Sequence, residues 1–216
     1  MIYIPPQSPL DILFKDKYLL VLNKPSGLLS VPGRGEDKQD CLITRVQSEY
    51  SDALIVHRLD MSTSGLMVIA RGKEIERSLS ILFQQREVNK KYIAIVDGEV
   101  TPTTGEINLP LITDWPNRPK QKIDFKNGKS SQTRYSVLSY DKNSNSSRIE
   151  LTPLTGRTHQ LRVHMQSIHH AILGDELYAN QFVINKSPRL LLHASYLCLP
   201  HPISGEMISI HSDAEF

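Results

Sequence analysis

The amino-acid sequence predicts an α+β fold in which a mixed, mainly antiparallel central sheet is flanked by helices and loops. Three observations favour this class. Short apolar, β-branched segments recur along the chain, two of them flank a hairpin-like turn at residues 143–145, and only three segments have helical spacing. No internal repeat or low-complexity linker occurs, so we expect one compact domain over residues 1–216.

Strands and helices are expected to alternate in the first half of the chain. Apolar runs bounded by turn residues predict strands over residues 18–22, 53–56, 66–70 and 92–96. A helix is predicted from Asp40, whose side chain can cap it, to about Tyr50. A second helix is predicted over residues 73–86, where apolar side chains recur on one face.

The second half is expected to be richer in antiparallel strands. It opens with a proline-rich stretch over residues 101–122, which we expect to be irregular. Strands are predicted over residues 133–140, 148–153, 189–199 and 207–211. A helix is predicted over residues 158–169, with Leu161, Met165 and Ile168 spaced for a core.

Composition and charge are those of an ordinary globular protein. Of the 216 residues, 39% are hydrophobic and 22% charged, and the net charge of +2 permits a nucleic-acid partner without arguing for one. The two cysteines are too few for a disulfide scaffold or a thiolate metal site. The first ten residues do not resemble a secretory signal and no apolar run approaches ~20 residues, so we expect a cytoplasmic protein without a membrane segment. No metal site is expected either, because metal-ligand spacing is missing among His159, His164, His169 and His170.

The segment His57–Gly65, HRLDMSTSG, is the most informative in the chain. It lies between two expected strands, yet it places an imidazole, a guanidinium and a carboxylate within four positions. Charges so close to a core are costly unless they are paired or used. The simple alternative is a surface turn in which the Asp60 side chain accepts backbone amide hydrogen bonds.

A second charged cluster, GRTHQLRVH at residues 156–164, favours a functional site over that alternative. Its two arginines and two histidines fall on an otherwise amphipathic predicted helix, where a guanidinium at the edge of a buried face requires a carboxylate partner. Asp60 is the candidate partner of Arg162, and such a pair would keep Asp60 ionised, as a nucleophile requires. Alternatively, Arg157 and Arg162 form a solvated helix face.

Five motifs, in order along the chain, resemble the signature of the RluA family of RNA pseudouridine synthases. They are NKPSGLLSVPG at residues 23–33, HRLDMSTSG at 57–65, KKYIA at 90–94, GRTHQLRVH at 156–164 and RLLLHA at 189–194. A further segment, DWPNRPKQK at residues 114–122, resembles the family member that modifies both large-subunit ribosomal RNA and tRNA. The resemblance implies the pseudouridine synthase fold, and we expect no S4-type RNA-binding domain of the kind that larger relatives carry.

The resemblance implies that the chain isomerises uridine to pseudouridine in RNA. The bond from uracil N1 to ribose C1′ breaks, the base turns over and C5 joins C1′, so no cofactor or metal is implied. Asp60 would be the catalytic aspartate, which either attacks C1′ or helps to form a glycal-like intermediate. A hydrolytic glycosidase usually requires a second carboxylate and a water, and the motif holds no second acid.

The resemblance also assigns roles to other side chains. Tyr92 matches the active-site tyrosine, which can stack on the flipped uracil and move the C5 proton, although a core aromatic would fit a strand equally well. Arg162 matches the basic partner of the aspartate, and Leu192 matches an aliphatic side chain against the base, where an ordinary core leucine would look identical. Arg58 matches the residue that fills the gap left by the flipped nucleotide, and His57 would help to hold the displaced stack.

The stretch over residues 114–134 carries six cationic side chains against two carboxylates. Such a run is usually a solvated face, but in a protein that holds a folded RNA loop it is the natural phosphate contact. We expect Arg118, Lys120 and Lys122 to contact the substrate. Trp115 is expected either to stack on a base or to anchor the loop.

The leading hypothesis has two RNA partners, large-subunit (23S) ribosomal RNA and the anticodon stem-loop of tRNAs, with a single RNA class as the alternative. A non-catalytic RNA-binding protein on the same scaffold would have no reason to keep Asp60, Tyr92 and Arg162 together. A nucleoside hydrolase would release free uracil. A monomer is expected for so compact a domain.

Overall fold

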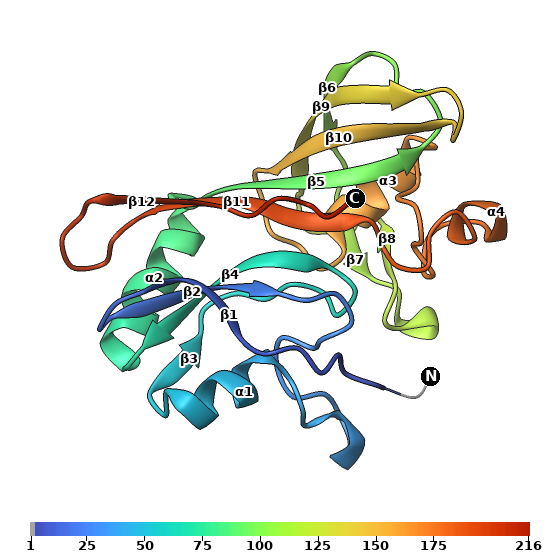
Figure 1. Cartoon of the computed structure of the whole chain (residues 1–216). Helices are drawn as coiled ribbons and strands as arrows, with labels where there is room; N and C mark the ends of the chain where they lie inside the picture. The colour runs from blue at the N-terminus through green and yellow to red at the C-terminus, as the bar shows by residue number, and fades with distance from the viewer. Residues whose placement is uncertain (1–2) are drawn as a thin grey trace. The chain divides into compact units, whose positions relative to one another are not determined.

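The computed structural model describes residues 3–216, which form two compact units (Figure 1). Within this described range, unit 1 comprises residues 3–90 and His193–Glu215, and unit 2 comprises Lys91–Leu192 together with Phe216. Each unit is built on β-strands and has its own buried cluster of apolar side chains. Within the described residues, no helix is both long and apolar enough to cross a membrane.

Unit 1 contains a mixed sheet in the order β1-β2-β4-β11, with β12 paired to β11 and β3 paired to β4. The pairing of β4 with β11 is parallel and the other pairings named here are antiparallel. Its strands are β1 (Asp11–Lys15), β2 (Leu19–Lys24), β3 (Ala53–Ile55), β4 (Ser64–Arg71), β11 (Leu192–Pro200) and β12 (Met207–His211). Its helices are the short 3-10 helix η1 (Glu36–Lys38), α1 (Leu42–Glu49) and α2 (Lys73–Gln85).

Two continuous apolar strands form the centre of unit 1. Strand β2 is buried along its first four residues, and β4 is buried from Ser64 to Ala70. Burial on both faces is what an uninterrupted apolar run predicts, since alternation would leave one face to water. Helix α1 packs against β3, and α2 packs against β3 and β4 with Ile75 and Leu79 buried.

Gly65, at the end of the HRLDMSTSG motif, is required by the close approach of β4 to β11. The two strands pair in register at Gly65 and Ala194. A Cβ atom at position 65 would lie 2.4 Å from the carbonyl oxygen of Ala194, and the φ of +110° is one that side-chain-bearing residues rarely adopt. The glycine therefore lets the motif enter the sheet directly.

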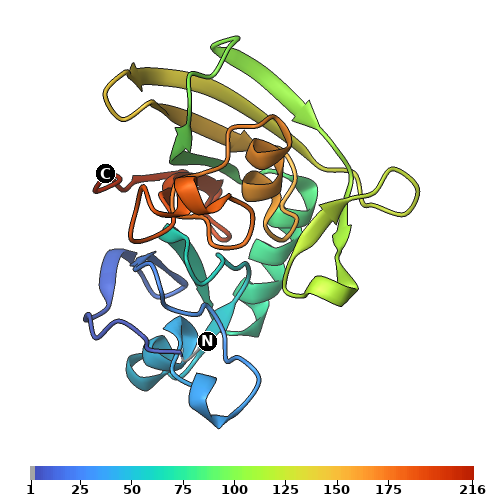
Figure 2. The same cartoon turned by 90° about the vertical axis from the view of Figure 1, so that its right-hand side faces the viewer.

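Unit 2 contains an antiparallel sheet in the order β5-β10-β9-β6 and a separate β7-β8 hairpin. Its strands are β5 (Asn89–Asp97), β6 (Thr104–Asn108), β7 (Leu111–Thr113), β8 (Gln121–Ile123), β9 (Gln132–Asp141) and β10 (Ser146–Pro153). Its helices are η2 (Trp115–Asn117), α3 (Gln160–Ser167) and α4 (Gln181–Ile184). Helix α3 packs against β10 and β8, and Figure 2 shows the hairpin as an arm of this unit.

The predicted class, α+β with a mixed and mainly antiparallel sheet, is confirmed, but one segment differs from its prediction and two elements were not predicted. Residues 101–122 were expected to be irregular and contain β6, β7 and β8. The prolines in this stretch stand outside the short strands, where they remove no ladder hydrogen bond. The segment before residue 18 contains β1, and residues 181–184 form α4.

Two predicted helices begin later than expected. Helix α1 has Cys41 rather than Asp40 at its N-cap, because the Asp40 carboxylate forms a two-pronged ion pair with Arg45 at 2.7 and 2.8 Å. Helix α3 begins at Gln160, because His159 adopts a left-handed conformation with φ +53°. That conformation cannot continue a right-handed helix towards the N-terminus.

Candidate active site

Asp60 stands in a short loop of unit 1, residues 56–63, between β3 and β4; we call it the Asp60 loop. Asp60 is partly buried, Arg58 is exposed and Leu59 is buried between them. The backbone N–H of Thr63 donates to the carbonyl oxygen of Asp60 at 3.1 Å, which closes a turn immediately before β4. The carboxylate therefore stands on a tight turn at the edge of a rigid strand.

A second loop, residues 24–30, holds the backbone of the Asp60 loop; we call it the cradle loop. It contains most of the NKPSGLLSVPG motif and begins at Lys24, the last residue of β2. The buried Ser30 hydroxyl donates to the carbonyl oxygen of Leu59 at 2.7 Å and accepts from the Leu59 N–H at 3.2 Å. Ser30 thus fixes both backbone groups of the residue that precedes Asp60.

The residues that follow Asp60 are held from the same cradle loop. The carbonyl oxygen of Met61 accepts from the Gly27 N–H at 2.8 Å and from the Lys24 ammonium at 3.1 Å. The Ser26 hydroxyl donates to the carbonyl oxygen of Ser62 at 2.7 Å. Lys24 is fully buried, so its charge is compensated by carbonyl dipoles instead of by water. The backbone is therefore held on both sides of the carboxylate.

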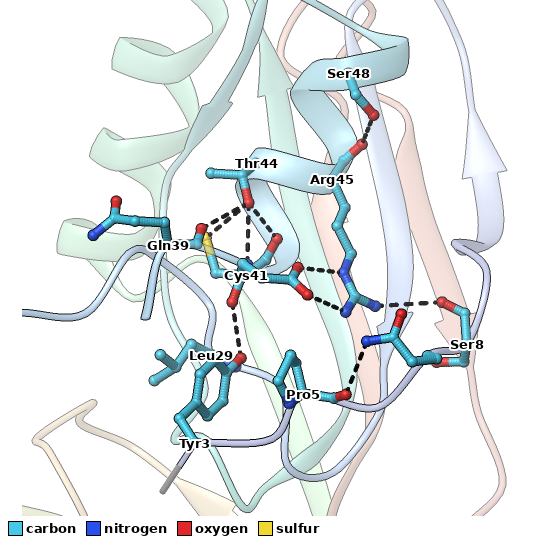
Figure 3. Close-up of polar contacts among 11 residues, drawn as sticks. Tyr3, Pro5, Ser8, Leu29, Gln39, Cys41, Thr44, Arg45 and Ser48 are labelled. Carbon is cyan, nitrogen blue, oxygen red and sulfur yellow. Dashed lines mark hydrogen bonds and ion pairs between the residues drawn. The ribbon is translucent and has the colours of Figure 1, made fainter. Parts of the chain in front are cut away.

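The cradle loop is itself tied to the N-terminal segment (Figure 3). The Tyr3 hydroxyl accepts from the Leu29 N–H at 3.1 Å and donates to the carbonyl oxygen of Asp40 at 2.9 Å. Arg45, which binds the Asp40 carboxylate, also donates to the carbonyl oxygen of Ser8 at 3.4 Å. Partial burial raises the pKa of Tyr3, so the phenol keeps its proton for this contact.

His57 is used by the fold of unit 1. Its Nε2 accepts from the backbone N–H of Val68 at 3.0 Å, and its ring stacks on Phe83 with the centroids 4.6 Å apart. Burial, assisted by the positive charge of Lys90, lowers the pKa of His57 to about 3. The imidazole is therefore neutral and anchors the start of the Asp60 loop to β4, while its predicted contact with a displaced RNA stack stays a prediction.

The neutral His57 makes stability depend on pH in a defined window. An unfolded histidine has a pKa of about 6.5, so between pH 6.5 and about 3 the unfolded chain binds the extra proton. The stabilisation is complete above pH 6.5 and is lost as the pH falls, by up to about 1.4 kcal/mol per pH unit from this group. Urea unfolding of the wild type and His57→Gln at several pH values checks this. The wild-type advantage should shrink on acidification, and a constant difference would contradict the assignment.

The far end of the Asp60 loop is also fixed within unit 1. The buried hydroxyl of Ser64 lies 2.9 Å from Nδ1 of the buried His193, and Nε2 of that ring lies 3.1 Å from the carbonyl oxygen of Ser212. His193 belongs to the RLLLHA motif. The motif therefore supports the loop through a histidine whose role the sequence did not reveal.

In unit 2, Arg162 forms a buried ion pair that the sequence did not predict. Its Nε lies 2.9 Å from Oδ2 of Asp175 and its Nη2 lies 2.7 Å from Oδ1, with side-chain exposures of 4% and 1%. The alternative of a solvated face is therefore wrong for Arg162 and holds only for the exposed Arg157. Asp175 lies in a turn with no motif of its own, so only its acidic type after an apolar run could have pointed to it. The predicted pairing of Asp60 with Arg162 stays a prediction.

Tyr92 and Leu192 both contribute to the cluster of buried apolar side chains in unit 2. Tyr92 lies on β5 opposite Leu151 of β10, and its half-buried ring packs against the core cluster. Leu192 is buried within the same cluster at 3% exposure. These positions fit the structural alternatives noted for both residues, and their predicted contacts with a base remain predictions.

The predicted basic stretch, residues 114–134, begins in the turn of the β7-β8 hairpin of unit 2, includes β8 and ends in β9. Lys122 is exposed on β8 and Lys120 is half-buried just before it. Arg118 is exposed, and its guanidinium carbon lies 4.5 Å from the Trp115 ring centre. Trp115 is 66% exposed, so it does not anchor the loop by burial and presents an aromatic face to solvent. The β7-β8 hairpin thus presents cationic side chains and an aromatic stacking surface to solvent.

The histidines in and beside α3 are hydrogen-bonded or exposed. His164 is fully buried, with Nδ1 2.9 Å from the Thr133 hydroxyl and Nε2 3.1 Å from that of Ser131. Burial lowers the pKa of His164, which keeps the ring neutral. No group of three His, Cys, Asp or Glu side chains suited to a metal ion occurs within residues 3–216.

Comparison with known proteins places these features in one family. The family model described as RNA pseudouridylate synthase matches residues 18–167. The dual-specificity RNA pseudouridine synthase RluA of Escherichia coli K12 is 50% identical over 215 residues, covering 99% of this chain and 98% of that protein. The protein of the same name from Yersinia pestis is 51% identical over 205 residues, covering 95% and 99%.

Two solved human structures share the fold. Human RNA pseudouridylate synthase domain containing 1 superposes with a TM-score of 0.80 at 28% identity, covering 97% of this chain and 86% of that one. Human RNA pseudouridylate synthase domain containing 4 gives a TM-score of 0.76 at 27% identity, covering 94% and 88%. With a family model over more than half its length and near full-length relatives at about half identity, this chain belongs to the RNA pseudouridine synthase family of isomerases, of the RluA type.

Proposed function

We propose that this chain isomerises specific uridines in two classes of RNA, large-subunit ribosomal RNA and the anticodon stem-loop of tRNAs. The observation that carries the proposal is identity of about one half, along nearly the whole chain, to enzymes named as dual-specificity synthases. The match includes the hairpin segment at residues 114–122, where cations and an exposed indole gather. A hairpin with these groups suits the backbone and bases of a folded RNA loop.

Asp60 is the catalytic residue of the proposal. Its carboxylate either attacks ribose C1′ as uracil N1 departs, or helps to remove a ribose proton to give a glycal-like intermediate. After the base turns over, C5 bonds to C1′ as the carboxylate leaves C1′ or, on the glycal route, as the ribose proton returns. The C5 proton is then lost while N1 gains one, so the reaction is a net isomerisation. The Asp60 loop is held by backbone contacts on both sides of the carboxylate, which supports the precise placement that such an attack requires.

Arg162 and Tyr92 complete the catalytic group of the proposal. Arg162 balances the charge of Asp60, and its rigid pairing with Asp175 supports the role, because a guanidinium held along one edge has a fixed orientation. Tyr92 stacks on the flipped uracil and moves the C5 proton in the last step.

Most substrate contacts of the proposal lie on exposed or loop positions, and Leu192, on β11, is the buried exception. Arg58, exposed beside Asp60, fills the gap left by the flipped nucleotide, and Leu192 lies against the base. The hairpin cations Arg118, Lys120 and Lys122 contact phosphates. His57 serves mainly as an anchor for the Asp60 loop, since its Nε2 and one ring face are occupied.

Removing the Ser30 hydroxyl should impair chemistry more than RNA binding. In Ser30→Ala both backbone groups of Leu59 lose their partner, so Asp60 moves from its position. We expect turnover to fall about tenfold and the free energy of unfolding to fall by about 1–2 kcal/mol. Single-turnover assays at saturating RNA and urea unfolding measure the two effects.

Ser48→Ala is the matched control for that variant. The exposed Ser48 hydroxyl also donates to a backbone carbonyl, that of Arg45, but on α1 (Figure 3). It should leave turnover unchanged. Equal turnover for the Ser30→Ala variant and the wild type would show that the cradle loop does not position the carboxylate.

The proposed function is tested by tritium release from C5-labelled uridine and by chemical mapping of pseudouridines. RNA from cells with and without this protein should differ at sites in both ribosomal RNA and tRNA. A difference in only one class would reduce the proposal to a single target. Tight RNA binding without isomerisation would favour the RNA-binding alternative, and release of free uracil would favour a hydrolase.

We also propose that the enzyme acts in the cytoplasm as a monomer.

A further inference from the structure

Tyr178 of unit 2 belongs to none of the five motifs, yet its side chain contacts three residues of two elements, β8 and α3. Its hydroxyl accepts from the backbone N–H of Gln121, the first residue of β8, at 2.7 Å. The same oxygen lies 2.6 Å from Nδ1 of His159, at the start of α3. The face of its ring lies 5.2 Å from the guanidinium carbon of Arg162, within cation–π range.

The turn that carries Tyr178 is built on the carboxylate that holds Arg162. Oδ1 of Asp175 accepts from the backbone N–H groups of Leu177 at 3.0 Å and Tyr178 at 3.2 Å. The same oxygen lies 2.7 Å from Nη2 of Arg162. The Tyr178 ring and the Asp175 carboxylate therefore both contact the Arg162 guanidinium from one short turn. Because the turn joins them, a shift of one of these two groups also moves the other.

The hairpin is attached to α3 at a second place, its base. His164 Nε2 lies 3.1 Å from the carbonyl oxygen of Leu109, just before β7, and 3.1 Å from the hydroxyl of Ser131, directly before β9. The two chain segments that flank the hairpin therefore meet α3 at one imidazole. Beyond this base, the Tyr178 hydroxyl also links β8 to the Arg162 region.

We propose that Tyr178 is a positioning residue that sets the Arg162 guanidinium according to the position of the β7-β8 hairpin. The inference rests on the proposed function, in which the hairpin contacts RNA and Arg162 serves the reaction. A tyrosine has only two side-chain torsions, so a shift of β8 pulls the hydroxyl and tilts the ring against the guanidinium. RNA seated on the hairpin would thus hold Arg162 in its productive orientation.

The test is Tyr178→Phe, which removes one oxygen and keeps the ring over Arg162. We expect kcat on a structured RNA substrate to fall about tenfold, while the Kd for that RNA changes less than twofold. His159→Ala, which breaks the same contact from the other side, should give the same split between kcat and Kd. Tyr140→Phe is the matched control, because that hydroxyl bonds Asn145 on the β9-β10 turn, away from the hairpin.

A double-mutant cycle separates positioning from a general loss of structure. If Tyr178 acts through the hairpin, then Tyr178→Phe and Lys122→Ala will reduce kcat together by less than the product of their separate effects. Multiplicative effects, or a kcat within twofold of wild type in both Tyr178→Phe and His159→Ala, would overturn the inference. Wild-type enzyme that forms no pseudouridine in the same RNA would instead refute the proposed function, and the inference with it.

Discussion

An Asp60→Asn variant is expected to bind RNA with near wild-type affinity and to lose at least about 10³-fold in turnover. The amide is nearly the same size as the carboxylate but cannot attack C1′ or take a ribose proton. The fold should be unaffected, because the loop is held through the backbone of Leu59, Met61 and Ser62. Tritium release gives the turnover, and thermal unfolding verifies the fold.

Asp52→Asn is the matched control. Asp52 is an exposed carboxylate of unit 1 that pairs with Arg71 at 3.1 Å, so its loss should cost less than about 1 kcal/mol and no activity. An Asp60→Asn enzyme that isomerises uridine at the wild-type rate would disprove the catalytic assignment.

Arg162→Ala should reduce both turnover and stability. It removes a proposed catalytic charge, and it leaves the Asp175 carboxylate buried without its ion-pair partner. Breaking a buried pair from one side costs roughly 3–5 kcal/mol, and both side chains here are almost inaccessible to water. We expect a large fall in the free energy of unfolding, measured with urea, and turnover at least about 10²-fold lower in the fraction that stays folded.

A second substitution separates the two effects. Arg162→Met combined with Asp175→Leu leaves no buried charge, so it should recover most of the stability while turnover stays low. Arg157→Ala, at an exposed position five residues earlier, serves as the control and should change neither quantity strongly. Recovery of wild-type turnover by the double variant would show that Arg162 serves structure alone.

Much of the fold was predictable because its central strands are continuous apolar runs, a purely local signal. The prediction of residues 18–22 and 66–70 as strands is confirmed by β2 and β4. Strand β1 was missed because it is a short edge strand that alternates exposed and half-buried residues behind a proline-rich start. Strands β7 and β8 were missed because three residues are too few to show a period.

In the candidate site, too, only the residues that carry a local sequence signal were predictable. Asp60 was found because its charge interrupts an apolar context and its motif is a family signature. Asp175 and Tyr178 were missed because each gains its role from a partner in another element, Arg162 or Gln121, and no local pattern encodes such a contact. The supporting role of Ser30 was hidden in the same way, since it acts on the backbone of a residue 29 positions later.

The side chains of the cradle loop bind the Asp60 loop through its backbone carbonyl oxygens, and this has an evolutionary consequence. Every amino acid supplies a carbonyl, so Met61 and Ser62 can be exchanged during divergence without loosening their attachment. The donors Lys24, Ser26 and Ser30 have no such freedom, because their side chains make the bonds. Substrate preference can therefore drift at the tip of the turn while the reactive carboxylate keeps its place.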